Sequence, residues 1–256
     1  MPNGDVGMRS LERGLAVIRA FPGHEAELTI ADLSRLTGYD RAVVRRILGT
    51  LERLEYVRYD DGRFSLRARI LELGSAYLAT NPLSRIGTER LVPFAEQTSE
   101  SCLLGVLDTD RVVYIARAQA ERIAGPVLRV GVTVEPHLIS IGRVLLAALD
   151  DAERDTYFAA AELVSRTPFT ITSEAVLRDE LVNVSDQGWC MVDQEIELGV
   201  VALAVPVRNA QGRVIAGMNI TTHTSRCSPD ELRSSYLGPL IEVRDKIEAD
   251  YALVRD

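Results

Sequence analysis

Three arginines stand close together in the segment TGYDRAVVRRILGTLERLEYV, residues 37–57: Arg41, Arg45 and Arg46. A guanidinium group attracts phosphate through its charge, and its fork of donors binds O6 and N7 of a guanine bidentately. The whole chain, by contrast, carries a formal charge of −8. Fixed positive charge on one short segment of an acidic chain indicates a local polyanion partner. The alternative interpretation is a solvated arginine face with no special role.

A helix over residues 41–54 is predicted to position these arginines. Its apolar face has helical spacing and consists of Val44, Ile47, Leu48 and Leu51. At about 100° per residue, the opposite side consists of Ala42, Arg46, Gly49 and Arg53, with Arg45 on the flank. Small residues permit close approach to a major groove, where Ala42 or Val43 could pack on a thymine methyl group. We therefore expect this helix to read base edges.

The neighbouring segments predict a winged helix-turn-helix over residues 8–67. Apolar spacing gives a first helix over 10–21, and Thr29 with Asp32 forms a capping box for a second helix. Gly38 suits the turn between helices, and Asp40 is a plausible N-cap of the third. The sequence YVRYDDGRFSL, residues 56–66, then predicts a hairpin around Asp61-Gly62. Arg58 and Arg63 flank that turn, as contacts from a wing to phosphates would require.

Length and composition limit the classes of protein to which this chain can belong. A length of 256 residues suits two domains, and 46% hydrophobic residues supports real cores. No apolar run is long enough to span a membrane, and the N-terminus has no secretory h-region, which predicts a cytoplasmic protein. Three widely spaced cysteines favour neither disulfides nor a zinc site. Residues 9–74 contain twelve arginines against ten carboxylates, so the rest of the chain carries the negative charge.

The remainder of the chain predicts an α+β domain over residues 85–256, after a linker helix over 68–84. Paired strand patterns around Asp108-Thr109-Asp110 and Ala210-Gln211-Gly212 indicate two hairpins. Helical patterns lie between them, at residues 142–149, 151–163 and 173–186. Hairpins with interspersed helices are typical of a mainly antiparallel sheet with helices packed on it.

Catalytic patterns are weak in this sequence. No G-x-S-x-G, H-E-x-x-H or G-x-G-x-x-G motif occurs, and no Gly-Lys-Ser/Thr of a phosphate-binding loop is present. Cys102 with His137 is a possible thiol–imidazole pair without any local motif to support it. Asp193 and Glu195 at a strand end are expected to be solvated or to cap the chain. We therefore expect no enzyme, no cofactor and no bound metal.

Several long stretches closely resemble the IclR family of bacterial transcription regulators. The first is residues 10–74, from SLERGLAVIRAF to RARILELG, and further stretches are VGVTVEPHLISIGRVLLAAL and QGWCMVDQEIELGVVALAVPVRNAQGRVIAGMNI. The segments RGLAVIRAF and SIGRVLLA look most like the branch that regulates protocatechuate, 4-hydroxybenzoate and β-ketoadipate catabolism. Family members usually have Lys-Ser-Thr where this chain has Arg41-Ala42-Val43, so a different operator is expected.

The resemblance implies a GAF-like effector domain and a homodimer or tetramer bound to double-stranded operator DNA. It also implies a small-molecule carboxylate effector on the concave face of the sheet, beneath the segment LISIGRV. Carried over residue by residue, the candidate effector-binding residues are Ser140, Ile141, Val200, Ala202, Asn219 and Thr221. Arg143, or failing that Arg117, is expected to pair with the effector's carboxylate.

Three alternatives remain open at this point. One is an enzyme with a DNA-binding appendage, and another is a repressor or architectural protein that responds to no ligand. The third is a regulator of the same family that responds to a smaller carboxylate such as glyoxylate or pyruvate.

Overall fold

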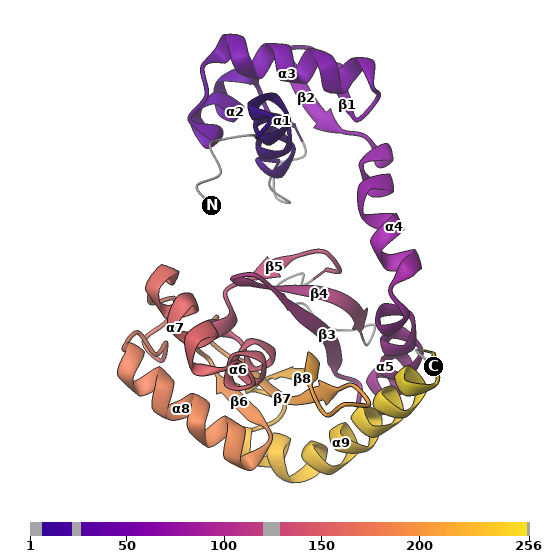
Figure 1. The fold of residues 1–256 in the computed structure, drawn as a ribbon, viewed down its shortest axis with the longest axis vertical. Coiled ribbons are helices and arrows are strands. Elements are labelled where there is room, and N and C mark those ends of the chain that lie inside the picture. The colour runs from indigo at the N-terminus through magenta and orange to yellow at the C-terminus, as the bar shows by residue number, and fades with distance from the viewer. Residues whose placement is uncertain (1–6, 22–26, 120–128, 255–256) are drawn as a thin grey trace. The chain divides into compact units, whose positions relative to one another are not determined.

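The computed structural model describes residues 7–21, 27–119 and 129–254, and it divides the chain into two compact units (Figure 1). The first unit is Met1–Ala76 and the second is Tyr77–Asp256. The division falls inside the segment expected to be a linker helix. None of the helices in these ranges is long and apolar enough to cross a membrane.

The N-terminal unit contains three helices and a two-stranded antiparallel sheet. Its elements are α1 (Arg9–Arg19), α2 (Ile30–Thr37), α3 (Arg41–Arg53), β1 (Val57–Asp60) and β2 (Arg63–Leu66). Val17, Leu33, Leu48 and Phe64 belong to one buried cluster that joins all three helices to the hairpin. This arrangement is the predicted winged helix-turn-helix.

Local signals set most of these boundaries. The capping box of Thr29 and Asp32 is present at the start of α2, and Gly38 follows that helix with φ of 70°. Asp61 and Gly62 have φ of 42° and 81° at the hairpin tip, which matches the turn chemistry of the Asp-Gly pair. Asp40 does precede α3, but its side chain makes no capping hydrogen bond, contrary to expectation.

A linker follows the hairpin. It consists of a short 3₁₀ turn, η1 (Ala68–Leu71), and the helix α4 (Glu72–Thr80). Asn81 then caps α5 (Pro82–Thr98) by accepting a hydrogen bond from the Leu83 N–H at 3.0 Å. Leu71, Leu73, Tyr77 and Leu78 are exposed large apolar residues of this linker.

The C-terminal unit is built on a six-stranded antiparallel sheet, which confirms the predicted fold class. The strand order is β5-β4-β3-β8-β7-β6. The strands are β3 (Ser101–Asp108), β4 (Arg111–Ala118), β5 (Thr133–Val134), β6 (Cys190–Asp193), β7 (Val200–Arg208) and β8 (Val214–His223). Both predicted hairpins are present as β3–β4 and β7–β8.

Helices cover both faces of this sheet (Figure 1). On one face α5 and α9 (Pro229–Val254) pack over a cluster that includes Cys102, Leu203 and Ile220. On the other face lie η2 (Pro136–Leu138), α6 (Ser140–Ala147), α7 (Asp151–Ala160) and α8 (Glu174–Gln187). A Cβ atom at Gly217 of β8 would come within 3.1 Å of Ile141 Cγ2, so α6 lies directly on the sheet.

Several helix boundaries differ from those predicted. The first helix ends at Arg19 rather than at residue 21, and the linker helix expected over residues 68–84 is a 3₁₀ turn followed by α4, which ends at Thr80. The helix expected from residue 142 begins at Ser140, because the carbonyl of Ile139 already accepts a helical hydrogen bond from the Arg143 N–H at 3.0 Å. The helix expected to reach residue 163 ends at Ala160, because Ala161 has an extended backbone. These shifts are at the ends of helices, where sequence periodicity is least informative.

Candidate functional site

The predicted recognition helix, α3, presents arginines to solvent. Val44, Leu48 and Leu51 are buried in the core of the N-terminal unit. The residues proposed to contact DNA from this helix lie outside that core: Arg41, Ala42, Arg45 and Arg46 are exposed, and Val43 is half-buried. Within residues 7–21 and 27–119, no ion pair or side-chain hydrogen bond occupies the guanidinium groups of the three arginines. They are therefore available to an external anion.

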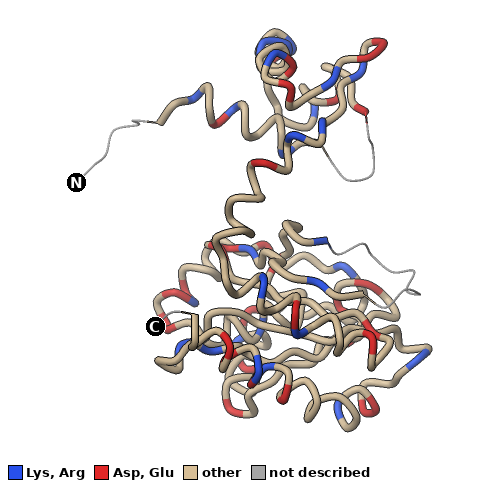
Figure 2. Tube along the Cα trace, turned by 90° about the vertical axis from the view of Figure 1, so that its right-hand side faces the viewer, with Lys and Arg blue, Asp and Glu red and all other residues tan. Residues whose placement is uncertain are grey.

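The wing adds two further cations. Arg58 on β1 lies 3.6 Å from Glu27 in a loose, exposed ion pair, while Arg63 on β2 is exposed beside the acidic tip of the hairpin. Tyr59 of β1 and Phe64 of β2 are cross-strand partners, and their ring centroids are 5.0 Å apart, so the two rings pack against each other. Figure 2 shows basic and acidic positions on both units, so the N-terminal unit is distinguished by which of its elements carry the arginines.

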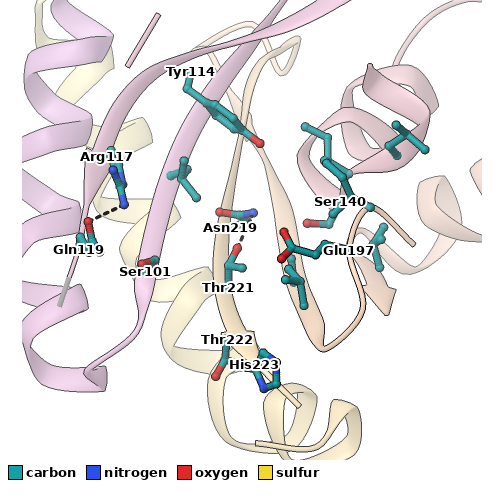
Figure 3. Close-up of a pocket in the computed structure, with 17 residues that line it drawn as sticks. Ser101, Tyr114, Arg117, Gln119, Ser140, Glu197, Asn219, Thr221, Thr222 and His223 are labelled. Atoms are coloured by element: carbon teal, nitrogen blue, oxygen red, sulfur yellow. Dashed lines mark hydrogen bonds between the residues drawn. The ribbon is translucent and has the colours of Figure 1, made fainter. Parts of the chain in front are cut away.

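The C-terminal unit contains a pocket between the sheet and the segment around η2 (Figure 3). Its floor is formed by cross-strand neighbours: Thr221 of β8 pairs with Ser101 of β3 and with Ala202 of β7. The pocket encloses about 980 Å³ of space between atoms, its open mouth included. The lining residues are Ser101, Leu103, Tyr114, Arg117, Gln119, Leu138, Ile139, Ser140, Val192, Ile196, Glu197, Val200, Ala202, Asn219, Thr221, Thr222 and His223.

A β-bulge brings two of these residues to the same face. Arg117 is opposite Leu103 and Tyr114 is opposite Gly105, with a register shift between Leu104 and Gly105. Residues three apart on a regular strand point to opposite faces of the sheet. A bulge inserts one extra residue between Tyr114 and Arg117, so their side chains point to the same face. Tyr114 and Arg117 therefore both line the pocket.

Polar groups inside the pocket lack partners. Ser140 Oγ, Asn219 Oδ1 and Arg117 Nε are buried without a hydrogen bond among the described residues. Asn219 Nδ2 donates to Thr221 Oγ1 at 3.1 Å, and Arg117 Nη2 donates to Gln119 Oε1 at 2.5 Å. A buried polar group without a partner costs about 1–3 kcal/mol, so these atoms are suited to bind water or a polar ligand.

The pocket is electrostatically two-sided. Figure 3 shows Arg117 on one side and Ser140 with Glu197 on the other, with Asn219 and Thr221 between them. Burial, and secondarily the charge of Arg129, lower the pKa of Arg117 from its ordinary value. A second cation near Arg117 adds to the attraction for an anionic ligand at that side. Three strand spacings separate β4 from β7, roughly 14 Å between backbones.

The pocket contains six of the eight predicted effector-binding residues. They are Arg117, Ser140, Val200, Ala202, Asn219 and Thr221. Ile141 does not line it, because its side chain packs against Gly105 and Gly217 beneath α6. The prediction missed Tyr114, whose place depends on the bulge, and Glu197, which comes from the β6–β7 connection.

Arg143 was the first candidate for the effector's carboxylate, and the structure corrects that prediction. Its side chain is buried outside the pocket, where Nη2 lies 2.5 Å from Glu195 Oε2 and Nε donates to the carbonyl of His137 at 2.9 Å. Glu195, expected to be solvated or capping, is therefore buried and paired. Arg117 is the arginine that remains in the pocket.

The possible thiol–imidazole pair is not formed. Cys102 lies in the cluster beneath α5 and α9, whereas His137 bonds the hydroxyl of Tyr157 through Nδ1 at 2.8 Å in the layer of α6 and α7. Burial raises the pKa of the Cys102 thiol, which disfavours the thiolate that nucleophilic chemistry needs. Across the described ranges, no group of His, Cys, Asp or Glu is placed to hold a metal ion.

Known proteins match the chain over nearly its whole length. The IclR helix-turn-helix domain model matches residues 10–61, and the bacterial transcriptional regulator IclR C-terminal model matches residues 75–249. The Pca regulon regulatory protein of Pseudomonas putida is 40% identical, over 91% of this chain and 81% of its own length. The p-hydroxybenzoate hydroxylase transcriptional activator of Acinetobacter baylyi is 34% identical, over 90% and 87%.

Two crystal structures are also similar. A transcriptional regulator from Rhodococcus sp. RHA1 has a TM-score of 0.85 and 36% identity, covering 97% of this chain and 100% of its own. The inducer-binding domain of the transcription factor PobR from Acinetobacter, a double mutant in complex with 3-hydroxybenzoic acid, has a TM-score of 0.61 and 33% identity. It covers 66% of this chain and 98% of its own.

Proposed function

The chain belongs to the IclR family of bacterial transcriptional regulators, and we propose that it couples operator binding to the sensing of a hydroxylated aromatic acid. The proposed DNA-binding domain is residues 8–67. The proposed effector domain, expected from residue 85, begins with α5 at Pro82, because Leu83 already belongs to the core of the C-terminal unit. The single observation that carries the proposal is the pocket in which Arg117 Nε, Ser140 Oγ and Asn219 Oδ1 are buried and find no hydrogen-bond partner among the described residues.

The chemistry of the pocket supports an aromatic monoacid. Arg117, with Arg129 nearby, suits a carboxylate, and the walls include Leu103, Leu138 and Val200. Buried apolar area contributes about 25 cal/mol per Å², which a ring supplies and a two- or three-carbon oxoacid does not. Glu197 on the far side accepts hydrogen bonds but repels a second carboxylate. These features favour 4-hydroxybenzoate or protocatechuate over β-ketoadipate, glyoxylate and pyruvate.

The relatives support the same class of ligand. The regulators of the pca and p-hydroxybenzoate systems take their names from aromatic-acid metabolism, and the similar inducer-binding domain contains 3-hydroxybenzoic acid. By analogy, this chain regulates genes of aromatic-acid catabolism in the cytoplasm. The proposal includes no catalytic step.

The DNA partner is double-stranded operator DNA. Arg41, Arg45 and Arg46 on α3 supply cations for the major groove, with Ala42 and Val43 at the points of close approach. Arg58 and Arg63 on the wing supply contacts to phosphates or the minor groove. Each of these residues is exposed or half-buried in the N-terminal unit, as a direct contact requires.

A homodimer or tetramer completes the proposal. The linker exposes Leu71, Leu73, Tyr77 and Leu78, and α1 exposes Leu11 and Leu15. Several exposed apolar side chains within one short segment, as in the linker, are typical of protein–protein contacts. Two copies would also present two recognition helices to the two halves of a palindromic operator.

A ligand panel tests the proposed function directly. Calorimetric titration of the full chain with 4-hydroxybenzoate, protocatechuate, β-ketoadipate, glyoxylate and pyruvate should give binding to the two hydroxylated aromatic acids. The same two acids should raise the melting temperature, because a ligand that binds the folded state stabilises it. Binding of glyoxylate or pyruvate alone would refute the aromatic assignment. Consumption of either aromatic acid during the titration would identify an enzyme instead.

A further inference from the structure

Arg143 and Glu195 form a buried ion pair behind the effector pocket. Their side chains are 2% and 8% exposed, and Arg143 Nη2 lies 2.5 Å from Glu195 Oε2. Arg143 belongs to α6, and Glu195 belongs to the connection between β6 and β7. Neither residue lines the pocket. The pair is therefore close to the ligand site without being part of its surface.

Each partner is attached to a wall of the pocket, Arg143 through a hydrogen bond and Glu195 through the chain itself. Arg143 Nε donates to the carbonyl of His137 at 2.9 Å, and His137 immediately precedes the lining residues Leu138, Ile139 and Ser140. Glu195 immediately precedes the lining residues Ile196 and Glu197. The ion pair, whose partners are 52 residues apart in the sequence, thus joins two walls of the pocket that are distant along the chain.

Glu195 also anchors a third segment, residues 167–171. Its Oε2 accepts a hydrogen bond from the Ile171 N–H at 3.0 Å, and its carbonyl accepts one from Thr170 Oγ1 at 2.6 Å. Thr167 Oγ1 donates to the carbonyl of Gln194 at 2.7 Å. These contacts surround a tight connection in which Gln194 has φ of 60° and Gly199 has φ of 82°. A left-handed non-glycine residue persists only where its surroundings hold it in place.

The energetics indicate what such a pair contributes. Removing two charges from water costs about as much as their attraction returns, so a buried ion pair adds little net stability. Replacing both partners by uncharged groups of similar size is often neutral, whereas removing one leaves an unpaired buried charge. What the pair supplies here is a fixed distance between the segments that it joins.

We infer that Arg143 and Glu195 are positioning residues for the effector site. The pair holds the Leu138–Ser140 wall against the Ile196–Glu197 wall. Ser140 and Glu197 are thereby kept on the side of the pocket opposite Arg117, where they can bind the effector. This inference rests on the proposed function, because it assigns the pair an effect on effector affinity. Without the pair, the two walls separate and the ligand must supply the energy to bring them together.

A double variant separates positioning from stability. Arg143→Met with Glu195→Gln removes both charges and keeps an amide oxygen to accept from the Ile171 N–H. Calorimetric titration with 4-hydroxybenzoate should show at least a tenfold rise in Kd. Urea unfolding of the ligand-free variant should give a midpoint close to that of the parent. A matched control is Arg90→Met with Asp250→Asn, which removes the 2.6 Å pair between α5 and α9 on the other face of the sheet. The control should bind with parental affinity.

A second variant keeps the test decisive if the double variant does not fold. Arg143→Lys retains the charge, but a lysine lacks the guanidinium fork that donates to both Glu195 and the His137 carbonyl. Its Kd should rise several-fold with the fold intact. Parental affinity in a folded double variant, or in Arg143→Lys, would overturn the inference. If the parent itself binds none of the aromatic acids, the proposed function has failed instead.

Discussion

At the scale of single residues, Arg117 is the residue that we propose to bind the effector's carboxylate. Arg117→Ala should abolish the rise in melting temperature caused by 4-hydroxybenzoate, because a carboxylate leaving water needs a cation or several donors. Arg233→Ala is the matched control: this arginine is exposed on α9, away from the pocket, and pairs weakly with Asp230 at 3.6 Å. It should respond like the parent. A normal response in Arg117→Ala would move the carboxylate to another part of the pocket.

Glu197 should decide between hydroxylated and unhydroxylated acids. Glu197 is exposed to solvent, so a hydrogen bond from a phenol to its carboxylate should contribute about 1 kcal/mol, less than the roughly 1.5–3 kcal/mol of a hydrogen bond to a charged group. Calorimetry should therefore show that the parent prefers 4-hydroxybenzoate over benzoate about fivefold. Glu197→Gln should reduce that preference and improve binding of β-ketoadipate, since a like charge is removed. Equal affinity of the parent for the two benzoates would exclude this role.

At the scale of elements, α3 is expected to read sequence. Arg46 lies on the exposed side of the helix, opposite the buried Val44 and Leu48. Arg46→Ala should cost about 1–3 kcal/mol in binding operator DNA, measured by fluorescence anisotropy, because a bidentate contact to a base is lost. Binding to DNA of random sequence is the control and should change much less. An equal loss on both would restrict Arg46 to phosphate contacts.

The wing is expected to act through charge alone. Arg63 stands beside the Asp61-Gly62 turn, and each phosphate contact contributes about 0.9 to the slope of log K against log salt concentration. Arg63→Ala should therefore reduce that slope by about one. Arg85→Ala, an exposed arginine of α5 that pairs with Glu89, should leave it unchanged. An unaltered slope in a folded Arg63→Ala variant would remove the wing from the DNA contacts.

Elements were predictable where their signals are local. The capping box of Thr29 and Asp32 and the hairpin at Asp61-Gly62 each lie within four residues, and both formed as expected. Arg143 shows the opposite case. Its proximity to Ser140 suggested a ligand contact, but its partner is 52 residues away in the sequence. Tyr114 was missed because strand alternation fails at a bulge, and no local pattern indicates which strand carries one.

At the scale of the whole molecule, a sensor must link its two sites. If the effector changes operator affinity by some factor, linkage requires that operator DNA change effector affinity by the same factor. We expect a factor of about ten, within the usual 1–3 kcal/mol of allosteric coupling. Operator binding should be measured by anisotropy with and without 4-hydroxybenzoate, and effector binding by calorimetry with and without operator DNA. The two ratios should agree, whichever direction the effect takes.

The same pair of titrations distinguishes a sensor from a ligand-blind DNA-binding protein. If neither ligand changes the affinity for the other, so that both affinity ratios equal one, the pocket and the DNA-binding domain act independently, even if each binds its own partner. Glu195 offers an internal check, because the Arg143→Met, Glu195→Gln variant changes the effector site and leaves the N-terminal unit untouched. Its operator affinity without effector should equal that of the parent. Because the variant's Kd for the effector is higher and the coupling between the two sites is unchanged, a higher effector concentration should be needed to produce the same change in operator affinity.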